Sequence, residues 1–132
     1  MNHKSISIRP FLGAKDFEES RSFYRDLGFR ESIVSANMSL FETGHTGFYL
    51  QRAYVKDWIE NTMVFLEVDD VHRYWDELQA LNLADKYPAV RLIPISKYDW
   101  GSECFLHDPS GILWHFGQFK LLEINPPFKR PI

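Results

Sequence analysis

The sequence predicts an α+β fold built from two similar β-α-β-β-β units, because one pattern occurs twice in its 132 residues. The first copy runs from Asp16 to Phe29, and the second follows about 54 residues later, from Asp70 to Leu83. In each copy apolar residues spaced by seven and three form one helical face, with the equivalent pairs Phe17 and Val71, Tyr24 and Leu78, and Leu27 and Leu81. A unit this small cannot bury its own sheet, so we expect two sheets around a shared cavity.

The first half of the chain contains clear start and stop signals. Asp16 is a good N-cap, Glu19 completes a capping box, and Gly28 occupies the usual glycine position after a helix. Turn residues at 36–37 and 43–46 separate the later strands. We expect a helix from Asp16 to about Leu27 and strands at Ser5–Phe11, Phe29–Ser35, Met38–Glu42 and Gly47–Arg52.

The second half repeats this order after a linker at Ala53–Asn61. It is expected to contain a strand at Thr62–Val68, a helix at about Asp70–Leu81, strands near Val90–Ile95, Gly101–His107 and Ile112–Gln118, and a tight turn at Asp108–Gly111. We therefore expect a single domain, residues 1–121, made of modules 5–52 and 62–119. The proline-containing C-terminal arm, 122–132, would lie on the surface or on a partner subunit.

Composition excludes several functions. The net charge is -3 and no Lys/Arg run forms a stripe, which argues against nucleic acid and membrane surfaces as partners. A single cysteine, Cys104, excludes an internal disulfide and suits a reducing compartment. No apolar run is long enough for a signal peptide or membrane span, so the expected location is cytoplasmic. The aromatic content of 16% fits either a filled core or a pocket for a flat ligand, and composition alone favours the core.

Two segments carry a family resemblance. Phe23-Tyr24-Arg25-Asp26-Leu27-Gly28-Phe29 and Phe105-Leu106-His107-Asp108-Pro109-Ser110-Gly111 resemble the vicinal oxygen chelate superfamily, which includes glyoxalase I, extradiol dioxygenases and bleomycin-resistance proteins. The resemblance covers about residues 5–119. It implies two βαβββ modules that form a cupped, incomplete barrel around a ligand site.

The resemblance also raises the question of a metal. Enzymes of this superfamily hold a divalent metal with side chains from the first and fourth strands of each module, and the matching positions here are Arg9, Gln51, Met63 and His115. The Arg9 guanidinium is a fixed positive charge without a free lone pair, and the Met63 thioether is too soft for hard divalent metals. Gln51 is at best a weak ligand, which leaves His115 as the one competent position. We therefore expect no metal and no cofactor.

Side chains alternate across strands, so the residues that face the cup can be predicted. The cup would be lined by Arg9, Tyr49, Gln51, Met63, Phe65, Glu67 and His115. Two interpretations of its charges remain open. In the first, Arg9 forms an ion pair with Glu67 or Glu103 at the place where related enzymes hold their metal. In the second, these charges orient a polar or cationic ligand.

The second half is most similar to the bleomycin-resistance branch, in residues 58–71 and 98–111. That branch lacks metal ligands, forms intertwined homodimers by exchanging its N-terminal strand, and sequesters a cationic glycopeptide drug in clefts at the interface. Its tryptophan before a glycine stacks on the drug, and the matching residue here is Trp100. The resemblance therefore implies a homodimeric, metal-free protein of the antibiotic-resistance type that binds a small molecule. Trp100 joins the cup residues as a ligand-binding residue, and no residue is assigned a catalytic role.

Two enzymatic alternatives remain. One is a glyoxalase-like or dioxygenase-like enzyme with an atypical metal site at His115 and Glu67 or Glu103. The other is a metal-free enzyme with Glu67 or His115 as general base. Arg9 and Met63 at ligand positions favour the binding protein over the metal enzyme.

Overall fold

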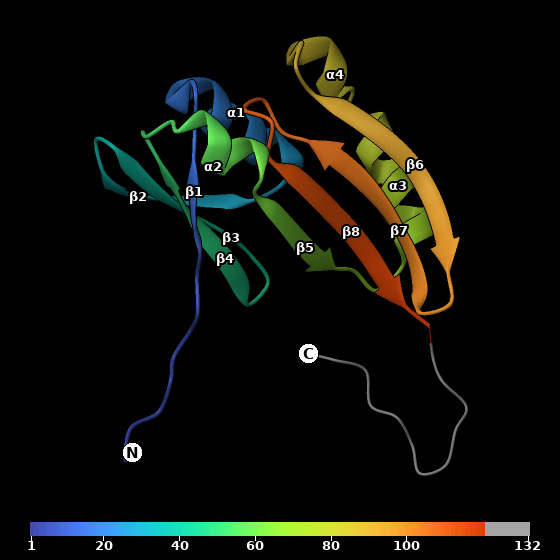
Figure 1. Ribbon diagram of the computed structural model, residues 1–132, viewed down its shortest axis with the longest axis horizontal. Helices are drawn as coiled ribbons and strands as arrows, with labels where there is room; N and C mark the ends of the chain where they lie inside the picture. Colours follow the sequence, from blue (N-terminus) through green and yellow to red (C-terminus); the bar gives the residue numbers. More distant parts are fainter. Residues whose placement is uncertain (121–132) are drawn as a thin grey trace.

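The structure is a computed structural model that describes residues 1–120, and in this range the chain forms two four-stranded sheets (Figure 1). The predicted arm at 122–132 lies outside the described residues. The elements are β1 (Phe11–Gly13), α1 (Phe17–Leu27), β2 (Arg30–Ser35), β3 (Met38–Thr43), β4 (Thr46–Gln51), α2 (Lys56–Glu60), β5 (Met63–Glu67), α3 (Val71–Ala80), α4 (Leu83–Lys86), β6 (Arg91–Tyr98), β7 (Gly101–His107) and β8 (Leu113–Phe119).

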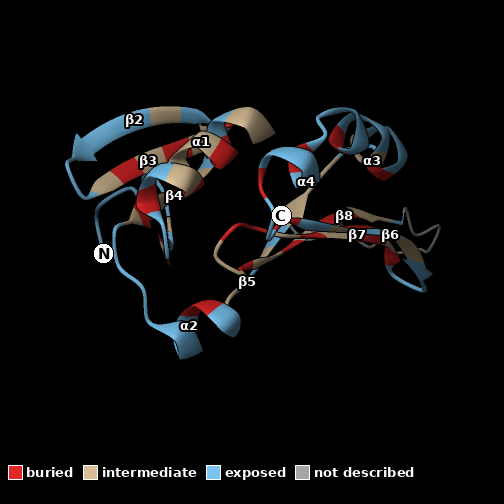
Figure 2. Cartoon of the chain, turned by 90° about the horizontal axis from the view of Figure 1, so that it is seen from above, coloured by how far each residue is buried: buried red, intermediate tan, exposed pale blue. Residues whose placement is uncertain are grey.

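The two sheets have the same topology, which confirms the predicted repeat. The first sheet has the strand order β1-β4-β3-β2 and the second has β5-β8-β7-β6. In each, the first strand of the module pairs in parallel with the last, and the other neighbours are antiparallel. The sheets stand beside each other and do not close into a barrel (Figures 1 and 2).

Both long helices begin at the predicted N-caps, and α1 also ends where its sequence predicts. Asp16 accepts a hydrogen bond from the backbone N–H of Glu19 at 3.0 Å. Asp70 makes the equivalent bond to Arg73 at 3.1 Å. Gly28 takes the left-handed conformation after α1, with φ 109°. The prediction that Leu81 belongs to the buried helical face is wrong, because α3 ends at Ala80 and the Leu81 side chain is 42% exposed.

The predicted strand at Ser5–Phe11 is also wrong. β1 begins at Phe11. Just before it, the backbone N–H of Tyr49 donates to the carbonyl of Pro10, and this is the last hydrogen bond between the two strands. Pro10 has no N–H to donate, so the pairing stops there and residues 1–10 form no regular element. This N-terminal segment extends away from both sheets (Figure 1).

Sequence patterns did not indicate the short helices α2 and α4. Each is held by one buried residue, Ile59 in α2 and Leu83 in α4. With five residues in α2 and four in α4, neither helix is long enough to show a helical period that the sequence analysis could recognise. Within residues 1–120 no helix is both long and apolar enough to cross a membrane.

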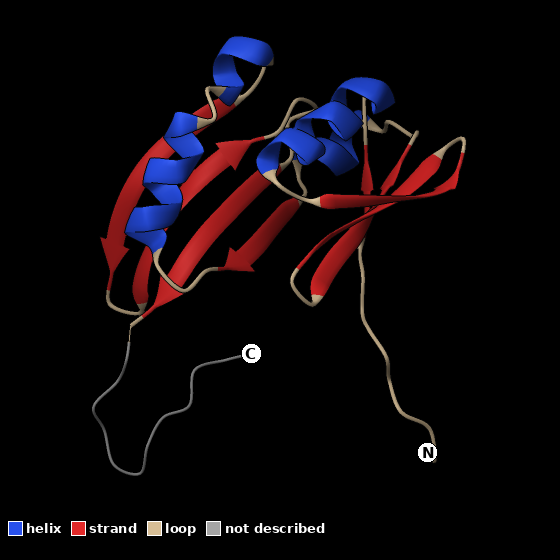
Figure 3. Cartoon of the chain, turned by 180° about the vertical axis from the view of Figure 1, so that it is seen from behind, coloured by secondary structure: helices blue, strands red, loops and turns tan. Residues whose placement is uncertain are grey.

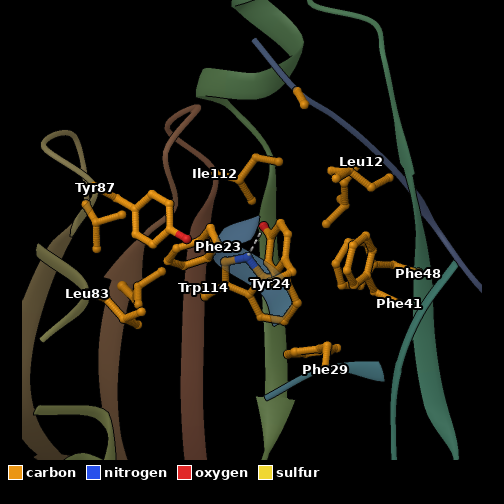
Figure 4. Close-up of a cluster of buried hydrophobic side chains, with 14 of the residues drawn as sticks. Leu12, Phe23, Tyr24, Phe29, Phe41, Phe48, Leu83, Tyr87, Ile112 and Trp114 are labelled. Atoms are coloured by element: carbon orange, nitrogen blue, oxygen red, sulfur yellow. Dashed lines mark hydrogen bonds between the residues drawn. The ribbon is translucent and has the colours of Figure 1, made fainter. Parts of the chain in front are cut away.

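The main core lies where α1 meets both sheets (Figure 4). The fully buried Tyr24 ring contacts Phe41 and Phe48 of the first sheet and Trp114 of the second. On the second sheet, α3 contacts β6, β7 and β8 and covers one face of the sheet (Figure 3). The helix of the first module therefore ties the two sheets together.

A buried polar network lies within this core. The Trp114 indole N–H donates to the Tyr24 hydroxyl at 2.9 Å, and that hydroxyl donates to Asp108 Oδ2 at 2.5 Å. Asp108 Oδ1 accepts from the backbone N–H groups of Ser110, Gly111 and Ile112, each at 2.9 Å. Burial raises the pKa of Asp108, and the hydrogen bonds from Tyr24 and the backbone oppose that rise. The network fixes the turn between β7 and β8 to α1.

Candidate ligand-binding site

Among residues 1–120, no helix covers one face of the second sheet (Figure 3). Strand alternation directs Cys104, Leu106, Trp114 and Phe116 to the face of the sheet that packs against the helices, and all four are buried. The opposite face carries Phe65, Phe105 and His115, which the strand register places side by side. Two apolar side chains on this face are largely exposed, Met63 at 66% and Phe65 at 43%. An exposed apolar face of this kind marks a ligand or protein contact.

One end of this face is a cluster of four aromatic rings, which we call the aromatic platform: Phe65, Tyr98, Trp100 and Phe119. Trp100 lies in the turn between β6 and β7, and its ring stacks on Tyr98 with centroids 5.4 Å apart and planes inclined by 9°. Phe119 and Phe65 contact the same indole at 5.4 Å and 6.0 Å. Trp100 still exposes 36% of its surface, so part of the indole remains accessible to a ligand.

Two glycines make the platform possible. A Cβ at Gly117 would stand 2.4 Å from the Phe65 ring, so the absence of a side chain lets that ring lie across β8. A Cβ at Gly101 would stand 2.1 Å from the Gln118 carbonyl oxygen. Gly101 therefore permits the close approach of β7 and β8 directly beside Trp100.

An acid–histidine pair lies next to the platform. His115 Nδ1 and Glu103 Oε1 are 2.6 Å apart, and the Glu103 side chain is almost fully buried. Phe105 meets the His115 ring edge-on at 4.9 Å, and Phe65 lies 6.3 Å away on its other side. Glu67 is on the same face by register, opposite Gly117. The open face therefore combines flat apolar surface with carboxylate charge.

The first sheet holds the other candidate residues. Arg9 donates to the Tyr49 hydroxyl at 3.4 Å and forms an ion pair with Glu42, also at 3.4 Å. The expectation that Arg9 pairs with Glu67 or Glu103 is wrong. β3 lies next to β4 in the first sheet, which brings Glu42 close to Tyr49. Glu103 is hydrogen-bonded to His115 in the second sheet. Gln51 lies at the end of β4, paired with Gly13 and Met38.

The candidate residues thus form two groups within one chain. The contacts of Arg9 and Tyr49 described above run within the first sheet, and those of Phe65, Trp100 and His115 run within the second. Ile8 and Pro10, at the end of the N-terminal segment, line a cavity of about 200 Å³ together with Phe65 of the second sheet.

Sequence reasoning missed three aromatic residues of this face: Tyr98, Phe105 and Phe119. Two of them could have been found by alternation, since Phe119 lies four residues beyond His115 and Phe105 lies two beyond Glu103. Tyr98 follows a β-bulge between Ile93 and Ser96. The bulge shifts the alternation of side chains along β6, so alternation alone could not predict which face of the sheet carries Tyr98.

The four positions that the superfamily uses for a metal do not fit one here. Arg9 is engaged with Glu42, and His115 is engaged with Glu103. Among residues 1–120 no three His, Cys, Asp or Glu side chains are placed to hold a metal ion. Cys104 faces α3, and burial raises the pKa of its thiol to about 11, which makes it a poor nucleophile.

Comparisons with known proteins agree with the fold described above. The family model of the Glyoxalase/Bleomycin resistance protein/Dioxygenase superfamily matches residues 7–116. The bleomycin-binding protein of bleomycin-producing Streptomyces verticillus, solved with copper(II)-bleomycin, has a TM-score of 0.74 and 23% identity, and the match covers 89% of this chain and 99% of that one.

Two further solved structures have the same fold. The bleomycin resistance determinant encoded on transposon Tn5 has a TM-score of 0.70 and 22% identity, over 89% of this chain and 100% of that one. Lactoylglutathione lyase from Agrobacterium tumefaciens has a TM-score of 0.67 and 18% identity, over 92% and 100%. No curated protein matches the sequence. Its two βαβββ sheets and the family match together place this chain in the glyoxalase/bleomycin resistance protein/dioxygenase superfamily.

Proposed function

We propose that this protein binds a flat, cationic small molecule on the aromatic platform without a metal ion. The observation that carries the proposal is the exposed stack of Trp100 on Tyr98, beside the buried carboxylate of Glu103. Aromatic faces attract flat rings and cations, and each such contact is worth roughly 0.5–2 kcal/mol. The structural neighbours that bind bleomycin support this proposal over a lyase activity, because Arg9 and Met63 occupy metal-ligand positions.

Replacing Trp100 tests the proposal. We expect Trp100→Ala to weaken binding of a flat aromatic cation by roughly 1–3 kcal/mol, or about 5- to 150-fold. Its free energy of unfolding should fall by no more than about 1 kcal/mol, because the indole packs only against other partly exposed rings. Ethidium and EDTA-treated bleomycin, titrated by calorimetry, are suitable probes.

The matched control is Trp58→Ala, which removes an exposed indole from α2, away from the platform. This control should leave both affinities unchanged. A large loss of stability in Trp100→Ala, with binding of both probes unaltered, would make Trp100 a structural residue and remove the platform as the binding site.

The same chain is proposed to act as a homodimer. Apolar side chains stay exposed on the N-terminal segment and on the open face, with Ile8 at 96%, Ile6 at 89% and Met63 at 66%. A second copy would cover these side chains. Its Arg9 and Tyr49 would then lie near the aromatic platform of the first copy, so that residues of both chains form the cup. A stable interface of this kind buries at least about 1,000 Å².

Light scattering at micromolar concentration should give twice the chain mass of 15.6 kDa. Double substitution of Ile6 and Ile8 by serine should shift the mass toward one chain, because it removes apolar contact area without touching either sheet. An unmodified protein that stays monomeric at this concentration contradicts the dimer.

One observation favours a second function, a metal-free enzyme. The Glu103 carboxylate 2.6 Å from His115 Nδ1 is the arrangement that orients an imidazole as a general base. The two functions differ in the fate of the ligand. Recovery of the bound molecule unchanged supports a binding protein, whereas conversion that is lost in His115→Asn supports catalysis.

A further inference from the structure

A second hollow lies at the other end of the second sheet from the aromatic platform. It has a volume of about 430 Å³, and its lining includes Lys15, Tyr54, Arg91 and His107 together with the turn at 108–111. We call it the basic hollow. Trp100 and His107 mark opposite ends of β7, so the two sites are about 20 Å apart along the strand. Three distant parts of the chain meet here, near α2 (Figure 1).

The two permanent cations of the basic hollow, Lys15 and Arg91, form no ion pair with the acids that the structure describes. Lys15 Nζ lies 5.8 Å from the centre of the Tyr54 ring, and neither Lys15 nor Arg91 forms an ion pair within residues 1–120. Arg91 and His107 are cross-strand partners on β6 and β7. Burial and the neighbouring Arg91 charge lower the pKa of His107. Lys15 and Arg91 are therefore two cations of one hollow that have no ion-pair partner among residues 1–120.

The two acids of the basic hollow are already engaged. Glu60 lies 4.0 Å from Lys56, one turn earlier on α2. Asp108 is fully buried, and its carboxylate accepts hydrogen bonds from the turn backbone and from Tyr24. Neither acid forms an ion pair with Lys15 or Arg91, so both cations can contact a bound anion.

We propose that the basic hollow binds a doubly charged oxyanion, the phosphate monoester group of a small molecule. Two permanent cations match two negative charges, whereas a carboxylate would compensate only one of them. The Arg91 guanidinium presents a fork of N–H donors, Lys15 supplies a point charge, and the Tyr54 hydroxyl and His107 ring add donors. This site does not depend on the proposed function of the platform.

Titration with inorganic phosphate, followed by NMR of the histidine rings, tests the proposal. We expect a saturable shift of the His107 ring signals and a higher His107 pKa when phosphate is bound, because the anion stabilises the imidazolium. His45, exposed in the turn between β3 and β4, is the internal control and should not respond. Arg91→Gln should weaken phosphate binding at least about tenfold, because it removes a hydrogen bond between two charged groups.

Lys97→Gln is the matched control, because it removes the same charge from the far end of β6. It should change phosphate affinity by less than about twofold, and so should Trp100→Ala, which separates this site from the platform. Equal losses in Arg91→Gln and Lys97→Gln, or His107 shifts that never saturate, would overturn the site. Acetate that binds as tightly as phosphate at equal ionic strength would overturn the assignment to a doubly charged anion.

Discussion

Asp108→Ala should lower the free energy of unfolding by about 3–5 kcal/mol. The substitution removes the acceptor of three backbone N–H groups at the β7–β8 turn and of the Tyr24 hydroxyl, all within a buried network. Each buried donor left without a partner costs about 1–3 kcal/mol, and neighbouring water can satisfy only some of them. Urea unfolding at pH 7, followed by tryptophan fluorescence and circular dichroism, measures the loss.

The control for this prediction is Asp99→Ala. Asp99 is an exposed acid in the other turn of the same sheet, between β6 and β7, so its removal should cost less than about 0.5 kcal/mol. Similar small losses in both variants would contradict the structural role given to the Asp108 network.

Glu31→Gln should destabilise the protein by about 2–3 kcal/mol at pH 7 and change its acid stability. Glu31 accepts hydrogen bonds from Arg21 at 2.6 Å, Arg25 at 2.7 Å and the Ser39 hydroxyl at 2.6 Å. Burial alone would raise the pKa of Glu31, but these hydrogen bonds lower it to about 2. The charged carboxylate therefore ties α1 to β2 and β3.

The sign of the pH effect follows from this lowered pKa. Because the folded protein holds the carboxylate charged down to about pH 2, its contribution is complete above the ordinary glutamate value of 4.5. It is lost as the pH falls from about 4.5 to 2. The unmodified protein and Glu31→Gln should therefore differ most at pH 7 and converge near pH 2 in urea unfolding.

Glu18→Gln is the matched control, since Glu18 also accepts from Arg21, at 2.7 Å, but its side chain is 60% exposed. Its removal should cost less than about 0.5 kcal/mol. A Glu31→Gln stability curve that stays parallel to the unmodified curve between pH 5 and 2 would contradict the lowered pKa.

Sequence patterns predicted the fold where several local signals agreed. Asp16 with Gly28, and Asp70 with its apolar repeat, marked both long helices because caps and periodicity coincide at the same residues. The patterns were wrong at the first strand, where the apolar alternation of residues 5–8 outweighed Pro10. Alternation predicts an extended chain, but only a partner strand with a complete ladder of donors makes a sheet.

The candidate site was harder to predict because it depends on pairing between strands. Alternation placed Phe65 and His115 on one face, and the register pairs them. The partner of Arg9 was missed because Glu42 becomes its neighbour only through the order of strands in the first sheet. Stacking of Tyr98 on Trp100 depends on a turn and a bulge whose geometry no periodic pattern encodes.

The central claim is that the site binds its ligand by aromatic stacking and charge, without a metal ion. The metal content of the purified protein tests this claim most directly. The purified protein would be incubated with Zn²⁺, Ni²⁺, Mn²⁺ and Fe²⁺ in turn, desalted and assayed by elemental analysis. We predict well below one equivalent per chain for every metal, because Arg9 and Met63 stand at the ligand positions and His115 is bonded to Glu103. One full equivalent of any of these metals, lost in His115→Ala, would contradict the account and indicate a metal enzyme.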